Sequence, residues 1–337
     1  MLPAALESRI RGSLWGVCVG DALGGPVQFS EPGSFDPLTG MEPVTPFRKP
    51  AGSYSDDGAM TLALAQSFID SEGAYNHELS IQYFCSWLAN GRFSTTSYAW
   101  DVGISTRLAL ETWRKHGTDQ ARETQRLVDR SLSRENRSGN GSLMRIAPMG
   151  VMLWTTPLTA QQLAIDQGSV THPAPACREA CAVYTDLMCR VMRGWLPTIL
   201  PNFGKDELCA AIHSHPAVQH DALADRLSKY KTRSSWASKS SSQMKSSGWV
   251  VDTLEVALWG LFKYDSFSEG ALAVVNLGGD SDTAGAVYGG IAGAFYGYES
   301  IPTEWVDQMQ NQTLISSVVQ KLVDLAPTER CRDLTLN

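Results

Sequence analysis

Apolar residues recur at helical spacing along much of the chain. Met60, Leu64 and Phe68 stand four residues apart, which places their side chains on one face of a helix. The same period recurs in three further segments, residues 105–115, 177–192 and 250–262. Alternating runs of β-branched residues are scarce, and strand and helix patterns do not follow one another as they do in parallel sheets. The pattern therefore predicts an all-α fold.

Residues 226–247 depart from this pattern. The segment is rich in serine and contains no acidic residue, and its basic residues are Arg226, Lys229, Lys231, Arg233, Lys239 and Lys245. Such a composition is typical of a solvated loop, and a phosphate-binding arm is the functional alternative. Because the apolar pattern resumes on both sides, we expect a flexible insertion within a single domain that spans residues 1–337.

Composition and charge restrict the class of protein. The 337 residues include 28 Lys+Arg and 35 Asp+Glu, which gives a net charge of −7, and 43% of the chain is hydrophobic. This composition is typical of a globular protein, and the acidic balance argues against general nucleic-acid binding. No segment reaches the roughly 20 consecutive apolar residues that a membrane-spanning helix needs, so we expect no association with a membrane.

The cysteines indicate a reducing compartment. Their number, seven, is odd, and no two form a Cys-x-x-Cys pair, which argues against a zinc ribbon or a redox-active dithiol. The amino-terminal residues lack the layout of a signal peptide. We therefore expect reduced thiols in a cytoplasmic protein, with the nucleus as the alternative. The cysteines are Cys18, Cys85, Cys177, Cys181, Cys189, Cys209 and Cys331.

Two acidic clusters each precede a helical pattern. The first contains Ser55, Asp56 and Asp57, and the second is the sequence Gly-Gly-Asp-Ser-Asp-Thr at residues 278–283. Ser55 is a natural helix N-cap, and acids in a first turn favour the positive end of the helix dipole, so capping alone explains the first cluster. Two adjacent carboxylates point in different directions, however, and a cap does not need both.

The second cluster opens a helix that is unusually rich in glycine. Gly289, Gly293 and Gly297 stand four residues apart, and each glycine inside a helix costs about 1 kcal/mol relative to alanine. Such a stripe lets another helix approach closely, which would press the aspartates against a second element. If the two clusters meet, their carboxylates repel one another unless cations neutralise them. Oxygen ligands favour magnesium, manganese or calcium over zinc and copper, and two ions bridged by aspartates are one solution.

Two further loops contain glycine beside small polar residues. Gly139, Asn140 and Gly141 precede an apolar run, a pattern typical of a loop that wraps an anion with backbone N–H groups, although most such sequences form ordinary turns. Residues 101–107 lead into a helical pattern in a similar way. His172 lies in a Thr-His-Pro loop, where it is either a structural or a catalytic histidine.

Together these segments resemble the ADP-ribosylglycohydrolase family, whose members include ADP-ribosylarginine and ADP-ribosylserine hydrolases and the enzyme that reactivates dinitrogen reductase. The resemblance extends over residues 10–300 in the family's order, and the two acidic blocks are its most specific parts. The matching segments are GDALGGPVQF (20–29), SYSDDGAM (53–60), GNGSLMRIAP (139–148), THP (171–173), SGWVVDTLEVALW (247–259) and GGDSDTAGAVYGGIAGAFYG (278–297).

The resemblance implies a compact orthogonal bundle of helices with two divalent cations, Mg²⁺ or alternatively Mn²⁺. It implies that the cations are held by Ser55, Asp56, Asp57, Asp280, Asp282 and Thr283. It also implies that an ADP-ribose-containing substrate contacts Gly103, Ser105, Gly139, Asn140, Gly141, Ser142, Met144 and His172, together with residue 28.

Position 28 departs from the family pattern. Many members carry glutamate seven residues after the aspartate of the GDALG block, where this chain has Gln28. An amide forms hydrogen bonds but does not take up a proton at neutral pH, so a mechanism that relies on that glutamate does not apply here. Either Asp56 or Asp57 activates the water, or the linkage that is cleaved differs from that of the glutamate-bearing members.

The activity implied by the resemblance is hydrolysis of the C1″ bond of an ADP-ribosyl group, N- or O-linked to a protein, by a monomeric enzyme. Asp56 or Asp57 would act as the base on a metal-bound water. Carboxylates near C1″ would stabilise the positive charge of the transition state. Three alternatives stay open: a hydrolase of a small derivative such as ADP-ribose-1″-phosphate or O-acyl-ADP-ribose, a non-catalytic ADP-ribose-binding or crystallin-like relative, and a nucleotide phosphohydrolase with an unrelated dinuclear site.

Overall fold

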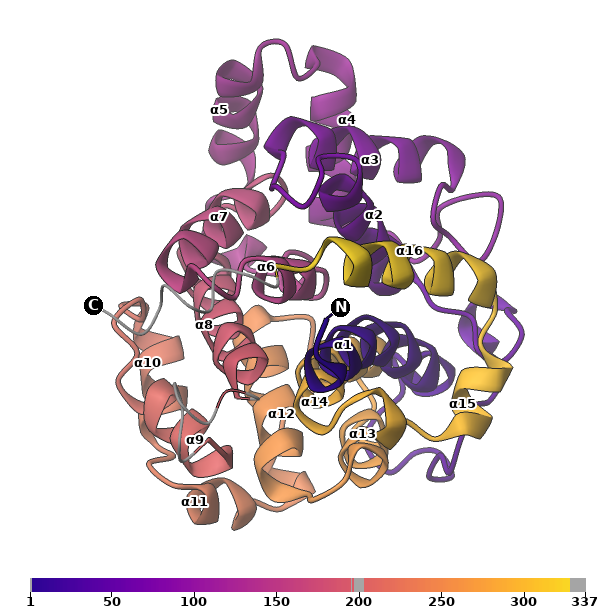
Figure 1. Ribbon diagram of the computed structural model, residues 1–337, viewed down its shortest axis with the longest axis vertical. Coiled ribbons are helices and arrows are strands. Elements are labelled where there is room, and N and C mark those ends of the chain that lie inside the picture. Colours follow the sequence, from indigo (N-terminus) through magenta and orange to yellow (C-terminus); the bar gives the residue numbers. More distant parts are fainter. Residues whose placement is uncertain (1, 195, 197–202, 328–337) are drawn as a thin grey trace.

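The described part of the chain is built from α-helices. The computed structural model describes residues 2–194, 196 and 203–327, and these contain sixteen α-helices and no β-strand (Figure 1). The predicted all-α class is confirmed. Cys331 lies outside the described residues. The helices are α1 (Ala4–Gly24), α2 (Asp56–Ile69), α3 (His77–Asn90), α4 (Ile104–His116), α5 (Ala121–Leu132), α6 (Ala147–Met152), α7 (Pro157–Ser169), α8 (Pro175–Arg193), α9 (Lys205–His213), α10 (Asp221–Ser228), α11 (Arg233–Ala237), α12 (Val250–Lys263), α13 (Phe267–Val275), α14 (Ser281–Tyr296), α15 (Thr303–Gln308) and α16 (Gln312–Leu325).

The segments with a clear helical period are all helices in the structure. The period of Met60, Leu64 and Phe68 falls within α2, and all three side chains are fully buried. The other three predicted segments correspond to α4, α8 and α12. The periodicity therefore identified the helices whose apolar face packs on the core.

The two central helices, α1 and α14, pack backbone against backbone (Figure 1). A Cβ atom added at Gly16 would lie 2.1 Å from the carbonyl oxygen of Gly289, and one added at Gly289 would lie 1.9 Å from that of Gly16. The approach repeats one helical turn away on either side. The predicted role of the glycine stripe is confirmed, and the partner is the amino-terminal helix with a stripe of its own. The pairs are Gly12–Gly293, Gly16–Gly289 and Gly20–Gly285.

The two helices are antiparallel, so the C-terminal end of α1 meets the N-terminal end of α14. There the Ser281 hydroxyl donates a hydrogen bond of 2.8 Å to the Gly24 carbonyl. Gly297, the third glycine of the predicted stripe, instead ends α14 with a φ of +90°. This arrangement brings the second acidic cluster beside the GDALG segment at the end of α1.

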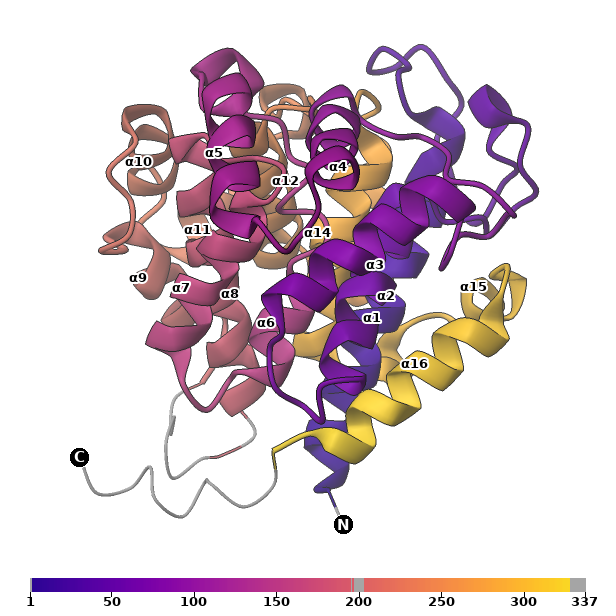
Figure 2. The same cartoon turned by 90° about the horizontal axis from the view of Figure 1, so that it is seen from above.

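The remaining helices enclose this pair in one continuous core. A single cluster of buried apolar side chains extends from Leu6 to Ala326. Figure 2 shows α16 running beside α1 and α2, so the last described helix closes over the first two. No helix in the described ranges is both long and apolar enough to cross a membrane.

Residues 226–247 are packed, in contrast to the solvated loop that their composition predicts. The segment contains the end of α10, all of α11 and a 3₁₀ turn, and Trp236 is fully buried with its ring centroid 4.2 Å from that of Tyr230. Arg226 and Lys239 pair with carboxylates of α12. Composition alone misses this structure because the acids that neutralise the segment lie outside it, on the following helix.

The α1–α14 contact predicts a large effect of one methyl group. Gly289→Ala places a Cβ atom against the backbone of Gly16, which no rotamer change relieves, so we expect a loss of about 3 kcal/mol in the free energy of unfolding. Gly204→Ala is the matched control, since a Cβ atom there meets nothing within 4 Å. Chemical denaturation of both variants measures the difference, and equal stabilities would contradict the proposed close contact.

Candidate active site

A cavity of about 580 Å³ lies where the ends of α1, α2 and α14 meet two loops. Its wall combines carboxylates on one side with glycine-containing backbone on the other. The lining residues are Phe29, Asp56, Asp101, Val102, Gly103, Ile104, Ser105, Thr106, Asn136, Arg137, Gly139, Asn140, Gly141, Met144, His172, Gly248, Asp280, Asp282 and Thr283. Both predicted acidic clusters thus contribute to one cavity.

The first turn of α2 is capped by Asp21, a residue of α1. Its carboxylate accepts hydrogen bonds from the backbone N–H groups of Ser55, at 2.9 Å, and Gly58, at 2.8 Å. The Ser55 hydroxyl makes no capping bond and instead donates to Asp57 at 3.0 Å. Ser55 therefore stands at the predicted N-cap position, but Asp21 does the capping. This leaves Ser55, Asp56 and Asp57 free of that role.

The start of α14 is held by a tight backbone turn. Gly278 and Gly279 have φ values of +67° and +62°, and a Cβ atom at Gly279 would lie 1.9 Å from the Ser246 carbonyl oxygen. The Gly279 carbonyl accepts a 2.6 Å hydrogen bond from the N–H of Phe29. Only glycine fits this turn, which sets Asp280 and Asp282 at the cavity wall.

The acidic side chains of the site are buried, and no basic side chain among the described residues pairs with them. Asp56, Asp57 and Asp282 are at most 7% exposed, and none of the ion pairs among the described residues involves them. Burial, followed by repulsion from neighbouring aspartates, raises the pKa of all three well above the usual range. Burial also raises the pKa of Asp21 to about 7, against the opposing effect of its backbone hydrogen bonds.

The opposite wall is the loop of residues 139–144, which is held in place by hydrogen bonds with buried side chains. The fully buried Arg145 donates a 2.8 Å hydrogen bond to the Gly141 carbonyl, and burial lowers its pKa to about 10. Asn140 donates through its side chain to Thr253 at 2.9 Å and to Asp280. The loop is thereby tied to the acidic wall across the cavity.

His172 supports this loop as a neutral imidazole. Burial, with Arg145 nearby as a smaller cause, lowers its pKa to about 3. Its Nδ1 atom lies 2.8 Å from the Thr171 hydroxyl, and a Cβ atom at Gly141 would lie 2.7 Å from its ring. His172 lines the cavity as predicted, and at neutral pH it offers a hydrogen bond rather than a proton.

Most of the residues singled out in the sequence line the cavity, and four lie behind its wall. Ser55 and Asp57 sit beneath Asp56 in the first turn of α2. Gln28 is 2% exposed, and neither of its amide atoms has a hydrogen-bond partner. Ser142 is fully buried and accepts a hydrogen bond from the Cys181 thiol at 3.5 Å. The last two therefore contribute to the packing around the cavity rather than to its surface.

The structure adds residues that the sequence reasoning did not select. Asp101 lines the cavity with a φ of +55°, and its Oδ2 atom has no hydrogen-bond partner. Burial raises its pKa, and the neighbouring side chains of Asp282 and Gln28 oppose this shift. Arg137 brings a cation to the rim. Asp101 is the first residue of the loop 101–107 that the sequence marks, and Arg137 lies two residues before the Gly-Asn-Gly loop, so closer attention to the residues around each motif was the available signal.

The donor set suits a hard divalent cation. The carboxylates are uncompensated, and the Oδ1 atom of Asp57 is buried without a hydrogen bond, which an oxygen-coordinated ion would relieve. Within the described ranges, however, no three His, Cys, Asp or Glu side chains are already arranged as a metal-ligand group.

Known proteins resemble this chain over more than nine-tenths of its length. An ADP-ribosylarginine hydrolase, Tri1, of Pseudomonas putida (strain GB-1) is 31% identical over 328 residues, which cover 97% of this chain and 81% of that protein. The ADP-ribosyl-[dinitrogen reductase] glycohydrolase of Rhodospirillum rubrum is 26% identical, with 92% of this chain and 92% of that protein covered.

A solved structure and a family model point to the same family as these relatives. A solved structure described as an ADP-ribosylglycohydrolase-related protein complex superimposes with a TM-score of 0.75 at 27% identity, covering 96% of this chain and 99% of that one. The model of the ADP-ribosylglycohydrolase family matches residues 2–331. The chain belongs to the ADP-ribosylglycohydrolase family, a family of hydrolases, as its motifs indicate.

Proposed function

We propose that this enzyme removes ADP-ribose from a modified arginine side chain of a protein, in a reaction that depends on two divalent cations. The observation that carries the proposal is the cavity itself, in which buried carboxylates face a glycine-containing loop. Full-length similarity to two ADP-ribosylarginine hydrolases, at 31% and 30% identity, supports arginine as the linkage.

The two walls of the cavity suit the two halves of ADP-ribose. The distal ribose, with its hydroxyl groups, fits the acidic wall of Asp56, Asp280 and Asp282. The diphosphate fits the loop of residues 139–144, where the Arg137 side chain and the N–H groups of Gly141 and Ser142, which donate to no backbone carbonyl in the described part of the chain, offer positive charge. This orientation places C1″ beside the carboxylates, which stabilise positive charge on the sugar during cleavage.

The cations would be held by Ser55, Asp56, Asp57, Asp280, Asp282 and Thr283, with Mg²⁺ preferred and Mn²⁺ as the alternative. When bound, divalent cations lower the pKa of coordinated water and so make a nucleophile available at neutral pH. The raised pKa values of the aspartates support this assignment, because such carboxylates gain most from a neutralising charge.

Proton transfer falls to the carboxylates at the cavity surface. Asp56 is exposed to the cavity, whereas Asp57 lies behind it, so Asp56 is the better placed of the two bases considered from sequence. Asp101 lies on the same wall with a free oxygen and a raised pKa. We assign to Asp56 and Asp101 the proton transfers that the glutamate of other members performs, since the amide of Gln28 neither takes up nor gives up a proton at neutral pH.

A second candidate is hydrolysis of a small ADP-ribose derivative such as ADP-ribose-1″-phosphate or O-acyl-ADP-ribose. Gln28 favours it, because an uncharged residue replaces the family's glutamate and lowers the repulsion of an anionic leaving group. In either case we propose a monomeric cytoplasmic enzyme. The free state of all six cysteines in the described residues is in keeping with a reducing compartment.

A substrate panel tests the proposed linkage. With Mg²⁺ present, we expect turnover of ADP-ribosyl-arginine at least about tenfold faster, as kcat/KM, than that of ADP-ribosyl-serine or ADP-ribose-1″-phosphate, a difference of about 1.4 kcal/mol in transition-state binding. Release of ADP-ribose measures it. Preference for the 1″-phosphate would favour the second candidate, and tight ADP-ribose binding without turnover of any substrate would favour a binding module.

Chelation tests the role of the cations. Because protons and metal ions compete for the carboxylates of Asp56 and Asp282, whose pKa values are raised, metal affinity should rise with pH beyond the range in which an ordinary aspartate titrates, by up to about tenfold per unit for each proton displaced. Titration calorimetry with Mn²⁺ measures this. Asp282→Asn should lose metal binding and turnover, while Asp324→Asn, at an exposed position on α16, should retain both. Full activity of the wild-type enzyme in excess chelator would refute metal dependence.

Removal of the rim cation tests the placement of the diphosphate. We expect Arg137→Ala to raise the Kd for ADP-ribose about tenfold. The Kd for Mn²⁺, measured without ADP-ribose, should stay unchanged, since Arg137 makes no ion pair with the aspartates. Arg137→Lys should recover part of the affinity. An unchanged ADP-ribose Kd in Arg137→Ala would place the diphosphate elsewhere.

A further inference from the structure

We propose that Asp252 is a positioning residue for the site: through Ser247 it anchors the strip of backbone at residues 246–250 that holds both walls of the cavity together. Asp252 itself does not line the cavity. The proposal builds on the proposed function for the identity of the ligand, and its structural part is independent of that function.

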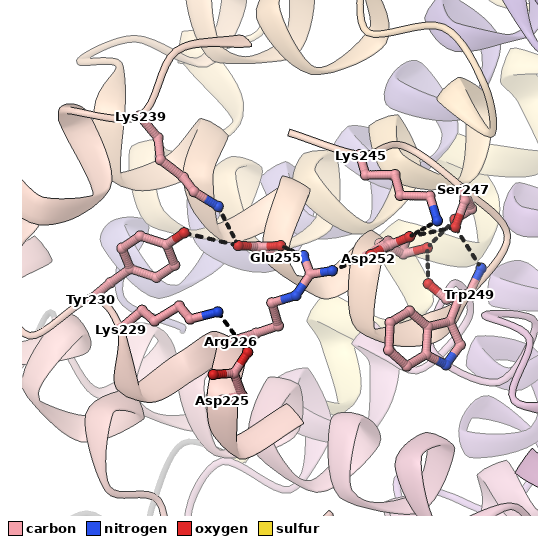
Figure 3. Close-up of polar contacts among 11 residues, drawn as sticks. Asp225, Arg226, Lys229, Tyr230, Lys239, Lys245, Ser247, Trp249, Asp252 and Glu255 are labelled. Atoms are coloured by element: carbon pink, nitrogen blue, oxygen red, sulfur yellow. Dashed lines mark hydrogen bonds and ion pairs between the residues drawn. The ribbon is translucent and has the colours of Figure 1, made fainter. Parts of the chain in front are cut away.

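Two carboxylates of α12, Asp252 and Glu255, are buried one helical turn apart. They are 0% and 1% exposed. Arg226 bridges them, at 3.1 Å from Asp252 and in direct contact with Glu255 (Figure 3). The segment 226–247 thus supplies the positive charge that lets α12 carry two buried acids. Pairing with these cations offsets the cost of removing the two carboxylates from water.

The two carboxylates differ in what else they bind. The polar partners of Glu255 come from the first part of the segment: besides Arg226, it accepts from Lys239 at 2.6 Å and from the Tyr230 hydroxyl at 3.1 Å. Asp252 also binds the end of the segment that adjoins the cavity: it accepts a 2.6 Å hydrogen bond from the Ser247 hydroxyl, and Lys245 Nζ lies 3.7 Å from it. Figure 3 shows this division, with Glu255 facing Tyr230 and Lys239, and Asp252 facing Ser247.

Ser247 belongs to a short strip of backbone that lies between the two cavity walls. On one side the Ser246 carbonyl accepts a 3.3 Å hydrogen bond from the N–H of Asp280. On the other side the Gly248 carbonyl accepts a 3.1 Å hydrogen bond from the N–H of Asn140. A third bond, from the N–H of Val250 to the Ser138 carbonyl at 3.0 Å, extends the attachment to the glycine loop.

The same strip is tied to α12 by Thr253. Its hydroxyl lies 3.2 Å from the Ser247 carbonyl and accepts the Asn140 side chain, which in turn donates to Asp280. The bonds made by the strip itself depend on where the strip lies, and the Ser247–Asp252 bond is one of the contacts that fix its position. A charge-assisted bond to a fully buried carboxylate is the strongest of the anchors, because it is shielded from water.

Matched variants separate this role from general support of the fold. Asp252→Ala and Glu255→Ala each remove one buried carboxylate and leave Arg226 with a single partner, so both should lower the melting temperature. Only Asp252→Ala and Ser247→Ala break the anchor of the strip. Asp252→Asn keeps an oxygen that accepts from Ser247, so it should recover part of what Asp252→Ala loses.

The readouts are the Kd for ADP-ribose, by calorimetry, and amide hydrogen exchange of residues 138–142 and 279–283. We expect Asp252→Ala and Ser247→Ala to raise the Kd about tenfold and to speed exchange in both segments. Glu255→Ala should keep the Kd within twofold and leave exchange in both segments as in the wild type.

Two outcomes would overturn the proposal. One is an unchanged Kd and unchanged exchange in Ser247→Ala and Asp252→Ala; the other is an equal effect of Glu255→Ala, which would show support of the fold alone. If the wild-type protein does not bind ADP-ribose, the proposed function fails, and the exchange rates still decide whether Asp252 fixes the two walls.

Discussion

The contact between α1 and α14 is the constraint on which the rest of the structure depends. Helices that meet through larger side chains lie about 8–10 Å apart, and the paired glycines remove those side chains along three successive turns. The end of α1 is thereby placed next to the start of α14. Asp21, on the last turn of α1, can then cap α2, so one helix contact determines where three helix ends, and their carboxylates, converge.

The molecule contains two sets of buried acids, which differ in whether basic side chains neutralise them. On α12, Asp252 and Glu255 are neutralised by basic side chains from the preceding segment. At the candidate site, Asp56, Asp57 and Asp282 have no such partner, and burial and mutual repulsion raise their pKa values instead. A fold gains nothing in stability from uncompensated buried charge, so this contrast separates the acids that support the structure from those available for chemistry.

Sequence reasoning succeeds here where one element carries its own signal. The period of Met60, Leu64 and Phe68 predicts α2, and the glycine stripe of α14 predicts a close helix contact. It fails where the signal is split between elements. The packing of residues 226–247 depends on acids in α12, and the capping of α2 by Asp21 joins residues far apart in the chain.

The same reasoning explains which parts of the candidate site were found. The acidic blocks and the Gly-Asn-Gly loop are local patterns, and the structure places both around one cavity. Asp101 and Arg137 have no sequence pattern that sets them apart, because each joins the cavity only through the neighbours that the fold brings to it. A single aspartate or arginine before a loop is too common to single out.

The pairing of the first helix with the fourteenth has a consequence for synthesis of the protein. Ser281 and Gly24, which meet at the cavity, are separated by 257 positions in the chain. During translation the amino-terminal helix therefore leaves the ribosome long before its partner exists, with its glycine face and the apolar residues around it unmatched. The acidic cavity cannot assemble until the start of α14 has emerged, so translation products that end before α14 lack the site altogether.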